Sequence, residues 1–231
     1  MSELLIEVLS EEIPYWLQKN IVEQFERKIK DLISENKLSS SKNFQIKSYF
    51  TQLRLIFFCE NLIKKQQSSI AIIRGPSIDA PNSAIEGFAR NIGINKKDLK
   101  QKDFNNKKYY FAEQKKIGKK SEDVIKDNLE SIITSLNWQK SMKWSHRNLK
   151  WGRPLKNIFF YFDNKPVSLN FLKNYSIDNN SFTFTHKKID KELKFRNFNE
   201  YKKKLFNSKI IIDQENREKK IKKEIYNFCK S

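Results

Sequence analysis

The stretch LLIEVLS, from Leu4 to Ser10, decides the fold, because it is a short and almost uninterrupted apolar run. A run of this length is typical of a buried β-strand. A helix is expected directly after it, with Pro14 at the first helical position, where a missing N–H costs nothing. Its apolar residues recur at helical spacing: Leu17, Ile21, Phe25, Ile29, Leu32 and Ile33. A buried strand followed by an amphipathic helix indicates a fold that mixes both kinds of element.

Two adjacent carboxylates, Glu11 and Glu12, separate this strand from the helix. Side chains at neighbouring positions do not face one another on a helix or a strand, so a pair of acid and base catalysts is the less favoured interpretation. We expect instead that their negative charge stabilises the positive N-terminal end of the helix.

The next part of the chain predicts more strands than helices. Residues 44–50 and 53–63 read as two strands close enough to pair, and residues 69–75 read as a third that ends at Gly75-Pro76, a turn signal. A short helix over 83–92 would bury Ala84, Phe88 and Ile92 and end at Gly93.

The second half of the chain continues the mixture. Residues 107–116 read as an aromatic strand, and Ser121 as the cap of the helix that follows. Residues 155–172 read as strand, turn and strand around Asp163-Asn164. The last third predicts one more strand pair, a helix near 200–206, a strand at 209–212 and a helix begun by Asp213.

The order of these elements predicts an α+β fold, with mixed sheets and packed helices, because the alternation is too irregular for a doubly wound parallel sheet. We expect one region over residues 1–231, divided into two close-packed lobes, 1–140 and 141–210, if it is divided at all. The final helix carries Ile221, Ile225 and Phe228 on one face and lacks a Gly, Asn or Pro at its end. From this we expect the natural chain to continue.

Charge is the strongest feature of the composition. With 46 Lys and Arg against 27 Asp and Glu, the net charge of +19 favours a polyanionic partner, nucleic acid first and an anionic membrane second. A nucleotide-biased genome that places Lys wherever charge is tolerated is the competing explanation, and it accounts for about half of the surplus.

Several classes of protein are disfavoured by what the sequence lacks. There is no run of about 18 apolar residues for a membrane span, and the first residues do not resemble a signal peptide. Cys59 and Cys229 each stand alone, which favours a reduced, cytoplasmic compartment. The chain has only five Gly and neither a phosphate-binding loop nor a zinc motif. We therefore expect no catalytic residue, no metal site and no cofactor in this chain.

The stretch KSMKWSHRNLKWGRP, Lys140 to Pro154, interleaves cations with two tryptophans. Arginine binds phosphate bidentately, and tryptophan offers a stacking face to a base. Its candidates for RNA binding are Lys140, Lys143, His146, Arg147 and Arg153. In the competing interpretation Met142, Trp144 and Trp151 are core anchors, and the charges form a solvated face. Both interpretations remain open on these residues alone.

Two further arginines are candidates for RNA binding. Arg54 lies inside an apolar strand, where a charge needs either a partner or a functional reason. Arg74 precedes the Gly75-Pro76 turn and could place its guanidinium beside a phosphate. The alternative for Arg74 is a solvated side chain next to an ordinary turn.

Several segments, each weak alone, occur in one order along the chain: LLIEVLSEEIP (4–14), TQLRL (51–55), IRGP (73–76), AIEGFAR (84–90), MKW (142–144), GRPLKNIFFYF (152–162), His186 and YKKKLFNSKIIIDQENREKKI (201–221). Together they resemble the N-terminal part of the beta subunit of the bacterial two-subunit glycine–tRNA ligase. The matching MKW and GRP segments favour packing for Trp144 and leave the Lys and Arg around them as candidates for the RNA backbone.

The resemblance implies a fold similar to the B3/B4 region of phenylalanine–tRNA ligase beta chains. It also implies that residues 213–231 begin the connection to an HD-like domain that this sequence lacks. The family's alpha subunit activates glycine with ATP and Mg²⁺, so this chain alone is expected to be inactive. The implied partners are the alpha subunit, glycine-specific tRNA and the remainder of the beta chain, all in the cytoplasm and none in a membrane.

Two functions follow as hypotheses. In the first, the chain is a non-catalytic part of glycine–tRNA ligase that positions the tRNA through phosphate contacts. In the second, it is a scaffold that contacts the alpha subunit and has no RNA affinity of its own. A hydrolytic editing site, by analogy with the phenylalanine system, is a third possibility for which the sequence shows no residue set.

Overall fold

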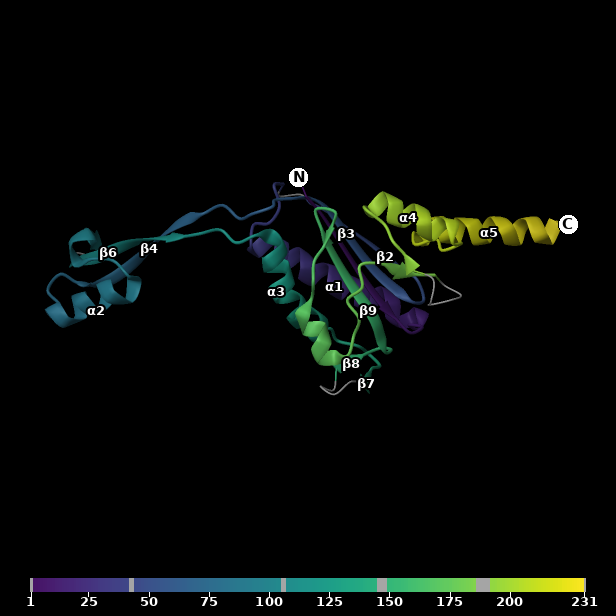
Figure 1. Cartoon of the computed structure of the whole chain (residues 1–231), viewed down its shortest axis with the longest axis horizontal. Coiled ribbons are helices and arrows are strands. Elements are labelled where there is room, and N and C mark those ends of the chain that lie inside the picture. Colours follow the sequence, from purple (N-terminus) through teal and green to yellow (C-terminus); the bar gives the residue numbers. More distant parts are fainter. Residues whose placement is uncertain (1, 42–43, 105–106, 145–148, 186–191, 231) are drawn as a thin grey trace. The chain divides into compact units, whose positions relative to one another are not determined.

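The computed structural model describes residues 2–41, 44–104, 107–144, 149–185 and 192–230 (Figure 1). The chain forms two compact units. The main unit comprises Met1–Lys65 and Lys120–Ser231, and the inserted unit comprises Gln66–Lys119. The expected division into lobes 1–140 and 141–210 is wrong, because a strand from the second lobe is built into the sheet of the first.

The main unit is built on a five-stranded sheet with the order β10-β9-β1-β3-β2, in which each described pairing is antiparallel. Its strands are β1 (Ser2–Ser10), β2 (Ile46–Phe50), β3 (Arg54–Leu62), β9 (Leu155–Phe162) and β10 (Lys165–Pro166). The predicted strand at Leu4–Ser10 therefore lies in the centre of the sheet. Asp163 and Asn164 both have positive φ and form the tight turn between β9 and β10.

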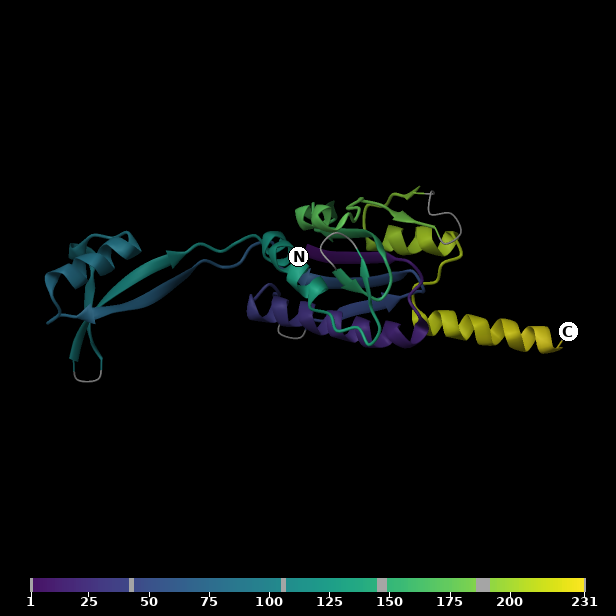
Figure 2. The same cartoon turned by 90° about the horizontal axis from the view of Figure 1, so that it is seen from below.

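Helices cover both faces of this sheet, and Figure 2 shows α1 and α4 on opposite sides of it. The helices are α1 (Tyr15–Glu35), α3 (Ser121–Thr134), α4 (Phe198–Asn207) and α5 (Gln214–Lys230). Leu4, Ile6 and Val8 point from β1 into the core beneath α1 and α3, whereas Leu5 packs into the core beneath α4. Because successive side chains alternate between two buried faces, nearly the whole strand is apolar.

The predicted helices are confirmed, with small changes at their ends. Pro14 occupies the N-cap position of α1, one residue before the expected place. Ser121 is the first residue of α3 and makes no capping hydrogen bond, so its predicted role as a cap is wrong. Asp213 does begin α5, because its carboxylate accepts the N–H of Asn216 at 2.9 Å.

The last third contains fewer strands than predicted. The expected strand pair is present as β11 (Thr183–Phe184) and β12 (Glu192–Leu193). Residues 209–212 do not form a strand, although Ile210 and Ile212 are buried in the core beneath α4. The segment after β10 forms the 3₁₀-helix η2 (Asn170–Tyr175) instead of continuing as a strand.

The inserted unit has a three-stranded antiparallel sheet with the order β4-β6-β5. Its elements are β4 (Ser69–Ser77), α2 (Asn82–Ile92), the 3₁₀-helix η1 (Lys96–Asp98), β5 (Lys100–Phe104) and β6 (Lys107–Lys116). Helix α2 packs Ile85 and Ala89 against Ala112 of β6. The predicted Phe88 and Ile92 also pack against this core, half-buried, whereas Ala84 is exposed and its predicted burial is wrong. Gly93 ends α2 with a φ of 77°, as predicted.

The two cysteines differ sharply in environment and give a simple test of the main core. Cys59 is buried on β3, and burial raises the pKa of its thiol to about 12, whereas Cys229 is exposed on α5. Because the thiolate is the reactive form, we expect a thiol reagent to modify one cysteine in the native chain and two in urea. Mass spectrometry after alkylation at pH 8 would show this, with Cys229→Ser as the control that leaves no rapid modification. Rapid native labelling of Cys59 would contradict this packing.

Candidate nucleic-acid interface

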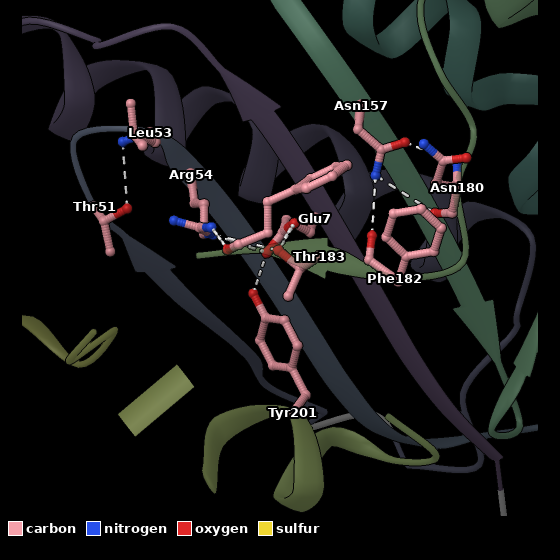
Figure 3. Close-up of polar contacts among 10 residues, drawn as sticks. Glu7, Thr51, Leu53, Arg54, Asn157, Asn180, Phe182, Thr183 and Tyr201 are labelled. Carbon is pink, nitrogen blue, oxygen red and sulfur yellow. Dashed lines mark hydrogen bonds and ion pairs between the residues drawn. The ribbon is translucent and has the colours of Figure 1, made fainter. Parts of the chain in front are cut away.

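Arg54 and Glu7 form an ion pair inside the main unit, on the face of the sheet that α4 covers (Figure 3). Arg54 Nε lies 3.3 Å from Glu7 Oε2, and both side chains are completely buried. Two hydroxyls add to the site: Thr183 Oγ1 donates to Glu7 Oε1 over 2.6 Å, and the Tyr201 hydroxyl donates to Glu7 Oε2. Arg54 Nη2 donates to the carbonyl of Phe184. The pair therefore joins β1 and β3 to β11 and α4.

Burial is the main influence on the two acidic groups of this cluster. It raises the pKa of the Glu7 carboxyl, against the opposing effects of the Arg54 charge and the two hydroxyl donors. It also raises the pKa of Tyr201 well above its ordinary value, and the nearby Glu7 charge adds to this. The phenol therefore keeps its proton and remains a donor. The cluster is a structural lock between the sheet and the segments above it.

A second polar anchor, Asn157 on β9, places the segment that carries Thr183. The Asn157 side chain is completely buried, and its Oδ1 accepts the N–H of Asn180 at 2.8 Å (Figure 3). Its Nδ2 donates to the carbonyls of Asn180 and Phe182, at 3.4 and 3.3 Å. An irregular segment is thus fixed by side-chain hydrogen bonds, which satisfy its buried backbone groups.

The prediction that Arg54 contacts RNA is wrong for this structure, because the side chain has no exposed surface and is bound to Glu7. The sequence did indicate that a charge inside this strand needs a partner, and that part is confirmed. Glu7 was missed as the partner, although a lone Glu inside the apolar run LLIEVLS carries the same signal.

The basic stretch divides between packing and surface. It forms the hairpin of β7 (Met142–Trp144) and β8 (Leu149–Trp151). Trp151 is completely buried and its ring centroid lies 4.8 Å from that of Trp138, so its interpretation as a core anchor is confirmed. Met142 is exposed, so the same interpretation is wrong for it. His146 and Arg147, like the side chain of Trp144, lie outside the residues described.

Lys140 and Lys143 are exposed on this stretch, and Arg153 lies nearby, with Nη1 3.9 Å from the sulfur of Met142. Arg153 also lines an open pocket of about 430 Å³ with Glu12, Tyr15, Trp16 and Gln52. Two backbone hydrogen bonds build this end of the sheet, from Glu11 N to the carbonyl of Pro154 and from Ile13 N to that of Gln52. The pocket could not be predicted from the sequence, because its walls come from three separate segments.

Exposed aromatic rings line this pocket. Tyr15 is 80% exposed and Trp16 58% exposed, at the start of α1, with ring centroids 5.2 Å apart in an edge-to-face arrangement. Glu11 Oε1 lies 3.8 Å from Lys156 Nζ in an ion pair, and the stabilisation of the helix end by Glu11 and Glu12 stays a prediction. We name Tyr15, Trp16 and Arg153, together with the exposed Lys140 and Lys143 of the adjoining basic stretch, the pocket edge.

Arg74 belongs to the inserted unit. It is exposed on β4, and its guanidinium carbon lies 5.2 Å from the ring centroid of Tyr109 on β6. Such a cation–π contact holds the side chain over the sheet. Of the predicted RNA-binding residues, Lys140 and Lys143 are exposed and Arg153 lines the pocket, whereas Arg54 is buried and Arg74 belongs to a separate unit.

Among the residues described, no group of three or more His, Cys, Asp and Glu side chains is arranged to hold a metal ion. None of the helices in the described part of the chain is long and apolar enough to cross a membrane.

Comparison with known proteins identifies the family. Residues 4–231 match the sequence model of the family described as glycyl-tRNA synthetase beta subunit. The chain belongs to this family. The glycine–tRNA ligase beta subunits of Rickettsia typhi, Rickettsia bellii (strain OSU 85-389) and Rickettsia canadensis are 34%, 33% and 32% identical to it over 223 residues. The aligned region covers 96% of this chain in each case, and 32%, 33% and 32% of the respective relatives.

The chain thus spans about a third of the length of the curated relatives that it matches. The segments that carried the resemblance now have places in the fold. LLIEVLSEEIP forms the central strand and its exit, and TQLRL contains Arg54 of the buried ion pair. GRPLKNIFFYF forms the strand beside β1 and ends the basic stretch. These family segments therefore supply the central strands of the main sheet, the buried ion pair and part of the pocket edge.

Proposed function

We propose that this chain is a non-catalytic, tRNA-positioning part of a glycine–tRNA ligase. In the assembled enzyme, ATP, glycine and glycine-specific tRNA would give glycyl-tRNA, AMP and diphosphate, with ATP and Mg²⁺ bound by the alpha subunit. The contribution of this chain would be to hold the tRNA backbone so that the acceptor end reaches that subunit. A fold similar to the B3/B4 region of phenylalanine–tRNA ligase beta chains and a cytoplasmic location belong to the same proposal.

The observation that supports this role is the pocket edge. Arg153 lies beside two exposed aromatic rings at one end of the main sheet, and Lys140 and Lys143 are exposed on the stretch that carries its neighbour Met142. Cations bind phosphates, and exposed rings accept bases or sugar edges. Cations placed beside exposed rings therefore favour RNA binding more than randomly scattered surface cations would. Glu12 lines the same pocket, so the charge of its lining is mixed and not uniformly positive.

The salt dependence of tRNA binding tests the proposal. If about four phosphates are neutralised, log K should fall with log[salt] with a slope of roughly −3 to −4. The double variant Lys143→Ala, Arg153→Ala removes two of these contacts and should make the slope less steep by about 2. The measurement is fluorescence anisotropy with glycine-specific tRNA, and a noncognate tRNA beside it, between 50 and 200 mM salt.

A charge-matched control is available at the other end of α1. Lys30 and Lys37 are exposed, and Lys30 lies about 20 Å along the helix from Trp16. Lys30→Ala, Lys37→Ala changes the net charge equally, so general electrostatics would shift both double variants alike. Equal slopes for the two variants would remove the pocket edge from the proposed interface.

A scaffold role is the second candidate, and α5 supports it. Within the described residues this helix buries none of its side chains, and Ile221, Ile225 and Phe228 are 51%, 58% and 83% exposed. A row of exposed apolar residues of this size marks a contact with another protein surface. Weak tRNA binding together with co-purification of the alpha subunit at high salt would favour the scaffold role over tRNA positioning.

A further inference from the structure

The inserted unit has one covered and one open sheet face. On the central strand β6, Ala112 faces α2, and Tyr110 packs against the same small core. Because side chains alternate along a strand, Tyr109, Phe111 and Glu113 point to the opposite face. Ile70 and Ile72 of β4 are 64% and 56% exposed there, since Ile72 pairs with Glu113.

The register places a cation on both sides of the half-buried Phe111 ring and on one side of the half-buried Tyr109 ring. Phe111 lies between Arg74 of β4 and Lys100 of β5 as their direct partner in each pairing. Tyr109 has Lys102 opposite it on β5, and the Arg74 guanidinium lies over its ring. The two rings follow one another on one face of one strand, about 7 Å apart. We name Arg74, Lys100, Lys102, Tyr109 and Phe111 the open face.

The charge of this region suits a polyanion. The inserted unit holds 11 Lys and Arg against 5 Asp and Glu, a net charge of +6. Glu113, the one acidic group of the central strand on this face, is bound by Lys100 over 2.5 Å, and that bond lowers its pKa. The side chains of Tyr109 and Phe111 are half-buried, while Arg74, Lys100 and Lys102 are exposed.

We propose that the open face binds single-stranded RNA, with one unpaired base stacked on Phe111 and a second replacing the Arg74 guanidinium on Tyr109, and with Arg74, Lys100 and Lys102 holding the backbone phosphates. Aromatic rings on an open antiparallel sheet accept splayed bases, because every base has a face that can stack, and the flanking cations follow the sugar–phosphate chain. The inference rests on the proposed tRNA role and specifies it further: this unit would take an unpaired stretch of the tRNA, such as a loop or an end.

The test uses the whole chain and a labelled ten-nucleotide single-stranded RNA of mixed sequence, with a hairpin of the same length as comparison. The variant Tyr109→Leu, Phe111→Leu keeps apolar side chains in the sheet and removes the stacking faces. We expect it to bind the single strand roughly tenfold or more weakly, and to lose the preference for the single strand over the hairpin.

Two more variants protect the test against misfolding and non-specific effects. Lys100→Gln, Lys102→Gln changes only exposed side chains and should also weaken the single-strand complex and reduce its salt dependence. Phe206→Ala, Tyr226→Ala removes one Phe and one Tyr that are each 59% exposed on the main unit, and should leave the affinity unchanged. Equal weakening by this control and by the open-face variant would overturn the proposal.

The outcomes also separate this inference from the proposed function. If the pocket-edge variant alters the tRNA salt slope while the open-face variant leaves single-strand binding unchanged, tRNA positioning stands and the open-face proposal is wrong. If the open face binds single strands but the pocket-edge variant leaves the tRNA salt slope unchanged, the open-face proposal stands and the pocket edge is removed from the proposed interface. Loss of binding to the alpha subunit in the open-face variant, with RNA affinity intact, would identify the face as a protein interface and overturn the proposal.

Discussion

Replacing Arg54 with alanine should lower the free energy of unfolding by about 3–5 kcal/mol, because it leaves the Glu7 carboxylate buried without its counter-charge. The carboxylate keeps its two hydroxyl donors, Thr183 and Tyr201, but hydrogen bonds to neutral groups do not replace an opposite charge. Urea denaturation followed by circular dichroism would measure the change.

Two comparisons make this result specific. Lys47→Ala breaks an exposed ion pair with Glu60, whose charged atoms lie 3.4 Å apart, and should change the stability by no more than about 0.5 kcal/mol. The double replacement Glu7→Leu, Arg54→Met removes both buried charges and should recover much of the stability that Arg54→Ala loses. If Arg54→Ala is as mild as Lys47→Ala, the buried pair does not lock the sheet to α4.

Replacing Trp151 with alanine should cost about 3–5 kcal/mol, as the loss of a large buried aromatic side chain does. The ring packs against Trp138, which in turn lies so close to Gly152 that a Cβ there would be 2.3 Å from its ring. Such tight packing leaves little room for the core to relax around a cavity. Urea denaturation again provides the measurement.

Trp16→Ala is the matched control, because Trp16 is the same residue type at a position that is 58% exposed. Its effect on stability should stay within about 0.5 kcal/mol. This contrast distinguishes the two roles that the sequence alone left open for tryptophans near clustered cations. A loss of stability for Trp151→Ala as small as that for Trp16→Ala would mean that Trp151 does not anchor β8 in the core.

Helices and strands could be predicted well from the sequence where burial of one face makes apolar residues recur at regular spacing. The central strand at Leu4–Ser10, helix α1 and the turn at Asp163-Asn164 follow from apolar spacing and turn residues, because these signals act over a few positions. The division into units could not be predicted in this way. It depends on β9 pairing with β1, two segments separated by about 150 residues, and no local pattern specifies that choice.

The candidate site was predictable only in part for the same reason. Arg54 stood out as a charge in an apolar strand, but the segment that holds Thr183 lies far along the chain and has no strong local pattern. The open face could not be predicted from any single segment of the sequence. Its rings and cations come from three strands, and only the register between them puts Phe111 between Arg74 and Lys100.

The hydrogen bonds of Glu7 also determine how late the sheet can be completed while the chain is being synthesised. Its two hydroxyl partners lie 176 and 194 positions later in the chain. At a synthesis rate of about 5–20 residues per second, Tyr201 leaves the ribosome roughly 10–40 s after Glu7. For most of that interval β1 can pair with β3 while β9 is still missing, and the cover of its second face follows later still. Although β1 precedes the other strands of the sheet in the sequence, it is therefore among the last to gain all of its neighbours.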